Sequence, residues 1–275
     1  MQSPKKRQKL DKHDEDIHLL DSRESESDEE SDEDKDEEET KTGRNADFFT
    51  SKDPDSGQLF VLVGKSERGK THFLKWLMMD QMFRAKNPVK TGIAFVGTKF
   101  KGSYGFLPQD RVFEGYNPAI LKQYISNLKK EFEEKGKLEP SFLICDDLLG
   151  ILNNDESWFN NFMGTFRQYN ITMYVAVQYL TGRHAISPTM REQTSYCIMF
   201  NSKTNKTIGH LYENYGQLFP SKQDFQDYYW DNTEPSKVGP YVCIVYKESE
   251  DRLEENYIPM RAPKELPFKG KGSAT

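Results

Sequence analysis

The most informative stretch of this sequence is residues 64–71, which read Gly64-Lys65-Ser66-Glu67-Arg68-Gly69-Lys70-Thr71. They follow the pattern G-x-x-x-x-G-K-[ST], in which a glycine-rich loop wraps around a phosphate group. Residues 58–63 (QLFVLV), before the loop, are typical of a buried parallel strand. Residues 72–85, after the loop, have the apolar spacing of a helix. Together the three segments predict a strand, a phosphate-binding loop and a helix that bind a nucleotide.

The residue types in the loop have chemical reasons. A phosphate needs several converging N–H donors, and glycine lets the backbone approach it without a side-chain clash. The start of the following helix adds a partial positive charge. Lys70 can reach the β- and γ-phosphates, and the Thr71 hydroxyl can bind Mg²⁺. We therefore expect all eight residues of 64–71 to bind ATP, with Lys70 also catalytic.

A second apolar run supplies carboxylates. Residues 141–147 (SFLICDD) read as a strand that ends in Asp146 and Asp147. We expect Asp146, with Thr71, to hold Mg²⁺, and Asp147 to polarise the attacking water. The long separation from Lys70 leaves room in the chain for a strand at 91–97 and a helix at about 118–135. An additional strand is therefore expected between the phosphate-loop strand and the Asp strand, as in RecA-like and AAA-like ATPases.

Residues 171–177 (ITMYVAV) form a further predicted strand, and Gln178 ends it. An amide at that point, beside the phosphate site, can sense the γ-phosphate. Arg167 precedes this strand and Arg191 follows it. An arginine that reaches the phosphates of a neighbouring subunit raises hydrolysis by roughly 10³- to 10⁵-fold. Taken alone, an arginine at either position is more often a surface or ion-pair residue than a catalytic one.

The rest of the globular part contains further predicted strands and helices. We expect strands at 195–200, 240–246 and 256–260, and helices at 203–214 and 221–230. The whole pattern predicts an α/β fold: a three-layer P-loop NTPase of the RecA-like (ASCE) type with a mostly parallel central sheet. This ATPase domain is expected to span 47–261, followed by a flexible tail at 262–275.

The charge of the chain is unevenly distributed. The whole sequence of 275 residues has a net charge of −6, but residues 1–46 hold 9 Lys/Arg and 17 Asp/Glu, a net −8. The remaining residues are net +2, and all the aromatic residues lie among them. Residues 1–46 therefore lack the apolar area that would offset the entropy of ordering them, and we expect a disordered acidic tail.

Several features of the sequence predict where in the cell the protein is located. The basic cluster at 5–9 is of the kind that nuclear import receptors recognise, and acidic residues follow Ser25, Ser27 and Ser31 at the spacing of acid-directed kinase sites. No apolar run reaches the 18 residues of a membrane-spanning helix, so no membrane partner is expected. The three cysteines all lie in apolar runs, which fits a reducing, intracellular compartment.

Four motifs together have a family resemblance. In chain order they are GKSERGKT (64–71), FLICDD (142–147), FRQYNITMYVAVQY (166–179) and SPTMREQTSY (187–196). In these the chain, over about 57–247, resembles the viral genome-packaging ATPases of poxviruses, other large DNA viruses and virophages, within the FtsK–HerA superfamily of P-loop ATPases. The phosphate loop is generic, and the part from Arg167 to Arg191 is more specific.

The resemblance implies roles for individual residues. Family members have an Arg before the fourth strand, a Gln at its end and a further Arg before the fifth strand, as Arg167, Gln178 and Arg191 are placed here. It implies that Arg167 is the arginine finger, which acts on the ATP bound to a neighbouring subunit. It also implies that Gln178 is the γ-phosphate sensor. The Asp146-Asp147 pair agrees with the form seen in this branch. Gln168 stands where the family commonly has His, which weakens the assignment to an exact lineage.

The resemblance also implies partners and a location. It implies an ATP- and Mg²⁺-dependent ring, a pentamer or hexamer, that pumps double-stranded DNA into a capsid built of capsid protein. The location would be the host nucleus, a viral factory or the virion. Basic residues cluster locally at Lys99 and Lys101 and at Lys264, Lys269 and Lys271, and they are candidate DNA contacts because a ring multiplies a few lysines.

Two other functions stay open at this point. One is an AAA-type or replicative helicase, although a convincing sensor arginine in a helical lid is lacking. The other is a non-enzymatic adaptor that uses nucleotide as a switch and binds basic partners through the acidic tail. The intact set of Lys70, Thr71, Asp146 and Asp147 favours hydrolysis.

Overall fold

The structure is a computed structural model that describes residues 57–83, 88–97, 104–148, 157–182, 186–247 and 253–264. The predicted acidic tail at 1–46, with its basic cluster at 5–9, lies outside these residues, as do Lys99, Lys101, Lys269 and Lys271. In the described part of the chain, no helix has the length and apolarity needed to cross a membrane.

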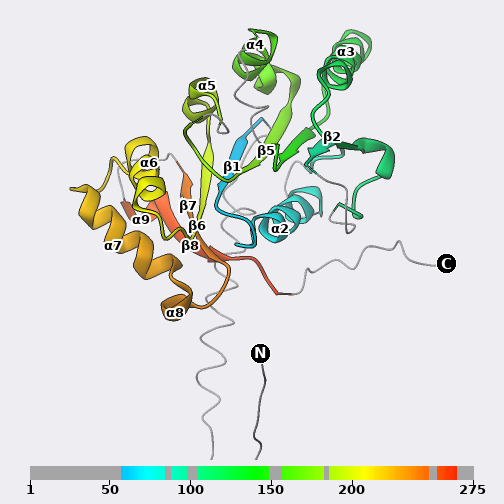
Figure 1. Ribbon diagram of the computed structural model, residues 1–275. Coiled ribbons are helices and arrows are strands. Elements are labelled where there is room, and N and C mark those ends of the chain that lie inside the picture. The colour runs from blue at the N-terminus through cyan, green and yellow to red at the C-terminus, as the bar shows by residue number, and fades with distance from the viewer. Residues whose placement is uncertain are drawn as a thin grey trace, which may run out of the picture.

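One sheet of eight strands organises the chain, in the order β3-β2-β4-β5-β1-β6-β7-β8 (Figure 1). Its strands are β1 (Leu59–Val63), β2 (Thr91–Val96), β3 (Val112–Glu114), β4 (Ser141–Asp146), β5 (Ile171–Val177), β6 (Tyr196–Phe200), β7 (Val242–Lys247) and β8 (Tyr257–Arg261). Pairings from β3 through β6 are parallel, whereas β7 and β8 are added antiparallel.

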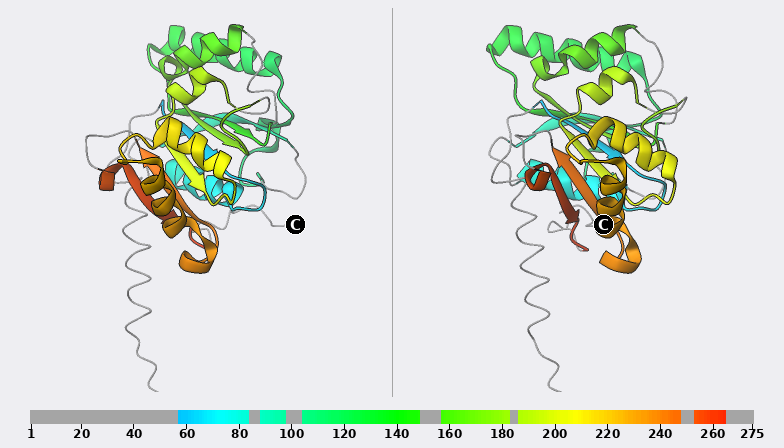
Figure 2. Two further views of the ribbon diagram at one scale, coloured as in Figure 1. Left: turned by 60° about the vertical axis from the view of Figure 1, so that its left-hand side comes forward. Right: turned by 90° about the vertical axis from the view of Figure 1, so that its left-hand side faces the viewer.

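Helices cover both faces of the sheet. They are α2 (Lys70–Phe83), α3 (Pro118–Lys135), α4 (Ser157–Thr165), α5 (Pro188–Glu192), α6 (Asn205–Tyr215), α7 (Lys222–Thr233), α8 (Pro235–Val238) and α9 (Leu253–Asn256), with 3-10 turns at η2 (Gln109–Arg111) and η3 (Phe166–Tyr169). Figure 2 shows α2 on one side of the sheet and α3, α4 and α5 on the other.

The strand sequences explain this layering. Every residue of β1 and β5 is buried, as expected of parallel strands with both faces covered. Alternate side chains of β1 point to opposite faces: Leu59 and Val61 join the core beneath α3 to α7, and Phe60 and Leu62 join the core beneath α2. The predicted three-layer P-loop NTPase fold with a mostly parallel sheet is confirmed.

The strand order confirms the expected additional strand. β5 lies between β1 and β4 and pairs with both, and β2 pairs with the outer side of β4. The carboxyl ends of β1, β4 and β5 therefore meet at the same edge of the sheet.

Several local elements follow the sequence closely. The helix predicted at about 118–135 has those bounds, because Asn117 caps its first turn and Gly136, at φ +67°, ends it. β3, three residues long, was not predicted. It is too short for its alternation to stand out from a loop.

Candidate nucleotide and magnesium site

The phosphate loop is fixed to its neighbours by backbone contacts. Gly64 donates its N–H to the carbonyl of Val177 at 3.1 Å, which ties the loop to the end of β5. A methyl group on Gly64 would lie 2.7 Å from Cβ of Phe200, so only glycine fits there. Gly69 has φ +93°, a left-handed conformation that glycine adopts without strain.

Lys70 lies buried inside this loop. Its Nζ donates hydrogen bonds to the carbonyls of Gly64 at 2.6 Å and Lys65 at 3.0 Å. Burial lowers the pKa of Lys70, while Asp146 and Asp147 oppose that shift. A phosphate oxygen, as a charged acceptor, is a stronger partner than either carbonyl. The cation is therefore positioned to move from the loop to a bound phosphate.

Thr71 and Asp146 form the candidate metal site. The Thr71 hydroxyl donates to Oδ2 of Asp146 at 3.3 Å, across the start of α2 and the end of β4. Asp146 is buried, and this desolvation raises the pKa of its carboxyl. A buried carboxylate beside a hydroxyl supplies the oxygen ligands that Mg²⁺ prefers. These two side chains fit the metal that the loop sequence implies.

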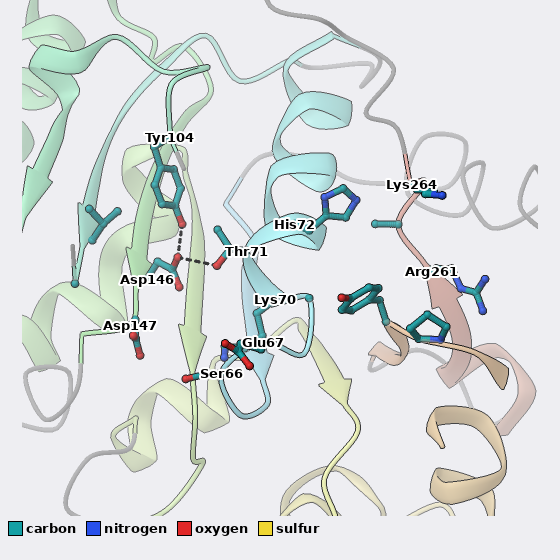
Figure 3. Close-up of a pocket in the computed structure, with 16 residues that line it drawn as sticks. Ser66, Glu67, Lys70, Thr71, His72, Tyr104, Asp146, Asp147, Arg261 and Lys264 are labelled. Atoms are coloured by element: carbon teal, nitrogen blue, oxygen red, sulfur yellow. Dashed lines mark hydrogen bonds between the residues drawn. The ribbon is translucent and has the colours of Figure 1, made fainter. Parts of the chain in front are cut away.

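Tyr104 is a site residue that sequence reasoning missed. Its hydroxyl donates to the same Oδ2 of Asp146 at 2.6 Å, and its ring is buried (Figure 3). Burial and Asp146 raise the pKa of Tyr104 far above its usual value. The residue lies in a turn after β2 with no motif around it, so no local signal marks it.

Asp147 and Gln178 meet at the edge of the loop. Gln178 Nε2 donates to Oδ1 of Asp147 at 3.1 Å and to Oγ of Ser66 at 3.3 Å. Asp147 is exposed and has φ +54°, which turns its backbone sharply at the end of β4. The amide thus links the phosphate loop to the second carboxylate, close to where a γ-phosphate would end.

A cavity of about 1050 Å³ is lined by Lys70, Thr71, Tyr104, Asp146 and Asp147, among others. One side comes from the phosphate loop, the start of α2, and the turns after β2 and β4. The other side comes from the antiparallel end of the sheet, and its residues are Pro240, Tyr241, Arg261, Ala262 and Lys264. Arg261 and Lys264 lie across the cavity from Asp146 and Asp147 in Figure 3. No sequence motif predicts this second side, and Lys264 lies in the segment 262–275 that was expected to be a flexible tail.

The two arginines lie away from this cavity within one chain. Arg167 is at the amino end of β5, and its guanidinium donates to the Gly57 carbonyl at 3.1 Å, to Gln193 and to Ser195. Arg191 donates to the carbonyls of Leu180 at 3.1 Å and Ile186 at 2.9 Å, and so braces the segment after β5. A finger role for Arg167 needs a second subunit and stays a prediction.

A sequence comparison finds a viral relative of this chain. No protein-family model matches the chain. It is 26% identical over 217 residues to the uncharacterized protein L437 of Acanthamoeba polyphaga mimivirus, covering 74% of this chain and 72% of that protein.

Solved structures extend the comparison. The genome packaging NTPase B204 of Sulfolobus turreted icosahedral virus 2 in complex with AMP is similar, with a TM-score of 0.53, 11% identity and coverage of 77% of this chain and 99% of that one. The same protein in complex with AMPPCP has a TM-score of 0.52, 12% identity and coverage of 77% and 99%. At such low identity the likeness establishes the fold alone, a P-loop NTPase.

Proposed function

We propose that this chain is a Mg²⁺-dependent ATPase that translocates double-stranded DNA and packages it into a viral capsid. The observation that carries the hydrolytic part is the meeting of Lys70, Thr71, Asp146, Asp147 and Gln178 at one edge of the sheet. Their side chains come from the phosphate loop and from the ends of two neighbouring strands, β4 and β5. A plain glycine-rich turn does not require such a set.

The side chains divide the work of hydrolysis. Lys70 exchanges its loop carbonyls for the β- and γ-phosphates. Thr71 and Asp146 would hold Mg²⁺, which would neutralise charge on the phosphate oxygens. Asp147 accepts a hydrogen bond from the attacking water, and Gln178 moves between Asp147 and the γ-phosphate. Positioning and charge stabilisation of this kind account for most catalysis of phosphoryl transfer.

The packaging part rests on resemblance. The neighbours of this fold include a protein described as a genome packaging NTPase, and the four motifs resemble the same family. On this proposal the chain acts as a ring of subunits, a pentamer or hexamer, with duplex DNA and a capsid protein as partners. It works in the host nucleus, in a viral factory or on the virion.

The test is phosphate release from ATP with and without duplex DNA, read beside the oligomer mass. We expect Mg²⁺-dependent turnover, stimulation by duplex DNA in the oligomer, and loss of turnover in Lys70→Ala. Strand separation would favour the helicase. A bound nucleotide without turnover, with or without DNA, would contradict the proposal and favour the nucleotide-switch adaptor.

A further inference from the structure

The second side of the nucleotide cavity contains an aromatic ring that the proposed hydrolysis does not use. Tyr241, just before β7, is 58% exposed, although large aromatic side chains are usually covered. Its φ is +65°, a left-handed conformation that is unfavourable for a bulky residue. Such strain persists where the surrounding structure holds it, often at a ligand site.

Tyr241 lies directly against the phosphate loop. A methyl group on Gly69 would be 3.0 Å from Cδ1 and 3.3 Å from Cβ of Tyr241. The ring is therefore next to the loop residue that immediately precedes Lys70. Any nucleotide whose phosphates occupy 64–71 must extend from the loop into this cavity.

The chain around the end of β8, on the same side of the cavity as Tyr241, is attached to neighbouring elements by hydrogen bonds. His72, on α2, shares a hydrogen bond with the carbonyl of Pro263 at 2.7 Å, and Arg261 donates to the carbonyl of Val238. The first bond ties the chain after β8 to α2, and the second ties the end of β8 to the end of α8, three residues before Tyr241. The second side of the cavity is thus a fixed surface beside the loop.

Two tyrosines are among the described residues that line the cavity, and they differ in how much of the side chain is exposed. Tyr104 is 4% exposed and its hydroxyl is bonded to Asp146. Tyr241 lines the cavity and is 58% exposed. An exposed ring face can stack on a base of any identity.

We infer that Tyr241 is the platform on which the nucleobase of the bound nucleoside triphosphate stacks. The inference rests on the proposed function, because it requires the phosphates to occupy the loop. Cationic Arg261 and Lys264 flank the same side of the cavity. The strained backbone is retained because it brings the ring to the loop.

The test compares a ligand that has a base with one that lacks it. Binding of ATP and of inorganic tripolyphosphate to the full chain is measured by calorimetry in the presence of Mg²⁺. Tyr241→Gly removes the ring and suits the left-handed backbone, so folding is retained, as its Tm will show. Tyr241→Phe keeps the ring, and Phe132→Ala removes an equally exposed ring, 53% exposed, on α3.

We expect Tyr241→Gly to weaken ATP binding by about tenfold, within the range of base–aromatic stacking, and to leave tripolyphosphate binding unchanged. Tyr241→Phe and Phe132→Ala should bind both ligands like the wild type. Equal loss of both ligands in Tyr241→Gly, or loss of neither, would overturn the stacking assignment and leave the phosphate site standing. Failure of the wild-type chain to bind either ligand better than Lys70→Ala does would contradict the proposed function itself.

Discussion

Asp146 is the buried carboxylate at the centre of the candidate metal site. Its Oδ2 accepts from both Thr71 and Tyr104, and burial raises the pKa of its carboxyl above the usual 3.8. On the proposed function, Mg²⁺ would bind the ionised form, so protons would compete with the metal. Because the pKa is raised, this competition begins at a higher pH than it would at an exposed aspartate.

The Tyr104→Phe variant tests whether protons compete with Mg²⁺ at Asp146. The Tyr104 hydrogen bond favours the ionised carboxylate, so its loss raises the pKa of Asp146 further. We expect weaker Mg²⁺-dependent ATP binding in the variant at mildly acidic pH, with the difference from wild type shrinking as pH rises. Calorimetric titrations of ATP, with and without Mg²⁺, over a series of pH values measure it. A wild-type Mg²⁺ effect that persists unchanged down to the ordinary aspartate pKa would contradict the raised value.

Among the elements, the strands that position the candidate site are predictable from the sequence, whereas the turns that complete its cavity are not. β1, β4 and β5 are apolar runs that lead into Gly64, Asp146-Asp147 and Gln178, and such runs are visible in a single sequence. Parallel pairing then brings their ends together. Tyr104 and Tyr241 come from turns, and their positions depend on the packing of distant segments.

The contact between β2 and β4 gives a test of the sheet. A methyl group on Gly92 would lie 2.2 Å from the carbonyl oxygen of Phe142, so Gly92→Ala forces these paired strands apart. We expect a loss of about 1–3 kcal/mol in the free energy of unfolding, measured by urea denaturation.

Gly164→Ala is the matched control. Gly164 lies in α4, and a methyl group there meets nothing within 4 Å. Alanine is the better helix former, so this change should stabilise the chain by up to about 1 kcal/mol. If Gly92→Ala were as stable as Gly164→Ala, the close approach of β2 to β4 would be wrong.

At the scale of the whole molecule, the active unit is proposed to contain more than one chain. Arg167 lies at the opposite edge of the sheet from the phosphate loop, where its guanidinium bonds to Gly57, Gln193 and Ser195. Burial lowers its pKa. An arginine at that edge can reach an ATP only in a neighbouring subunit. Such a contact between subunits is not contained in the structure of one chain, so its prediction depends on the family resemblance.

Mixing two inactive variants tests this arrangement. Arg167→Ala subunits keep a complete phosphate loop, and Lys70→Ala subunits keep the arginine. We expect each alone to lose most turnover, roughly 10³-fold or more for the arginine, and mixed oligomers to recover part of it. Absence of recovery in oligomers of native mass would contradict action in trans.

We propose that the carboxyl edge of β1, β4 and β5 hydrolyses ATP, and the Asp147→Asn variant gives the sharpest test of that proposal. The substitution keeps the shape of the side chain and removes the charge that activates water. Steady-state phosphate release and ATP affinity are measured together on the wild-type chain and on the variant, with Mg²⁺ and duplex DNA. We predict that ATP binding is retained and that turnover falls by about 10²- to 10⁴-fold. Equal turnover in the two proteins, or no turnover in the wild type, would show that this edge does not hydrolyse ATP as proposed.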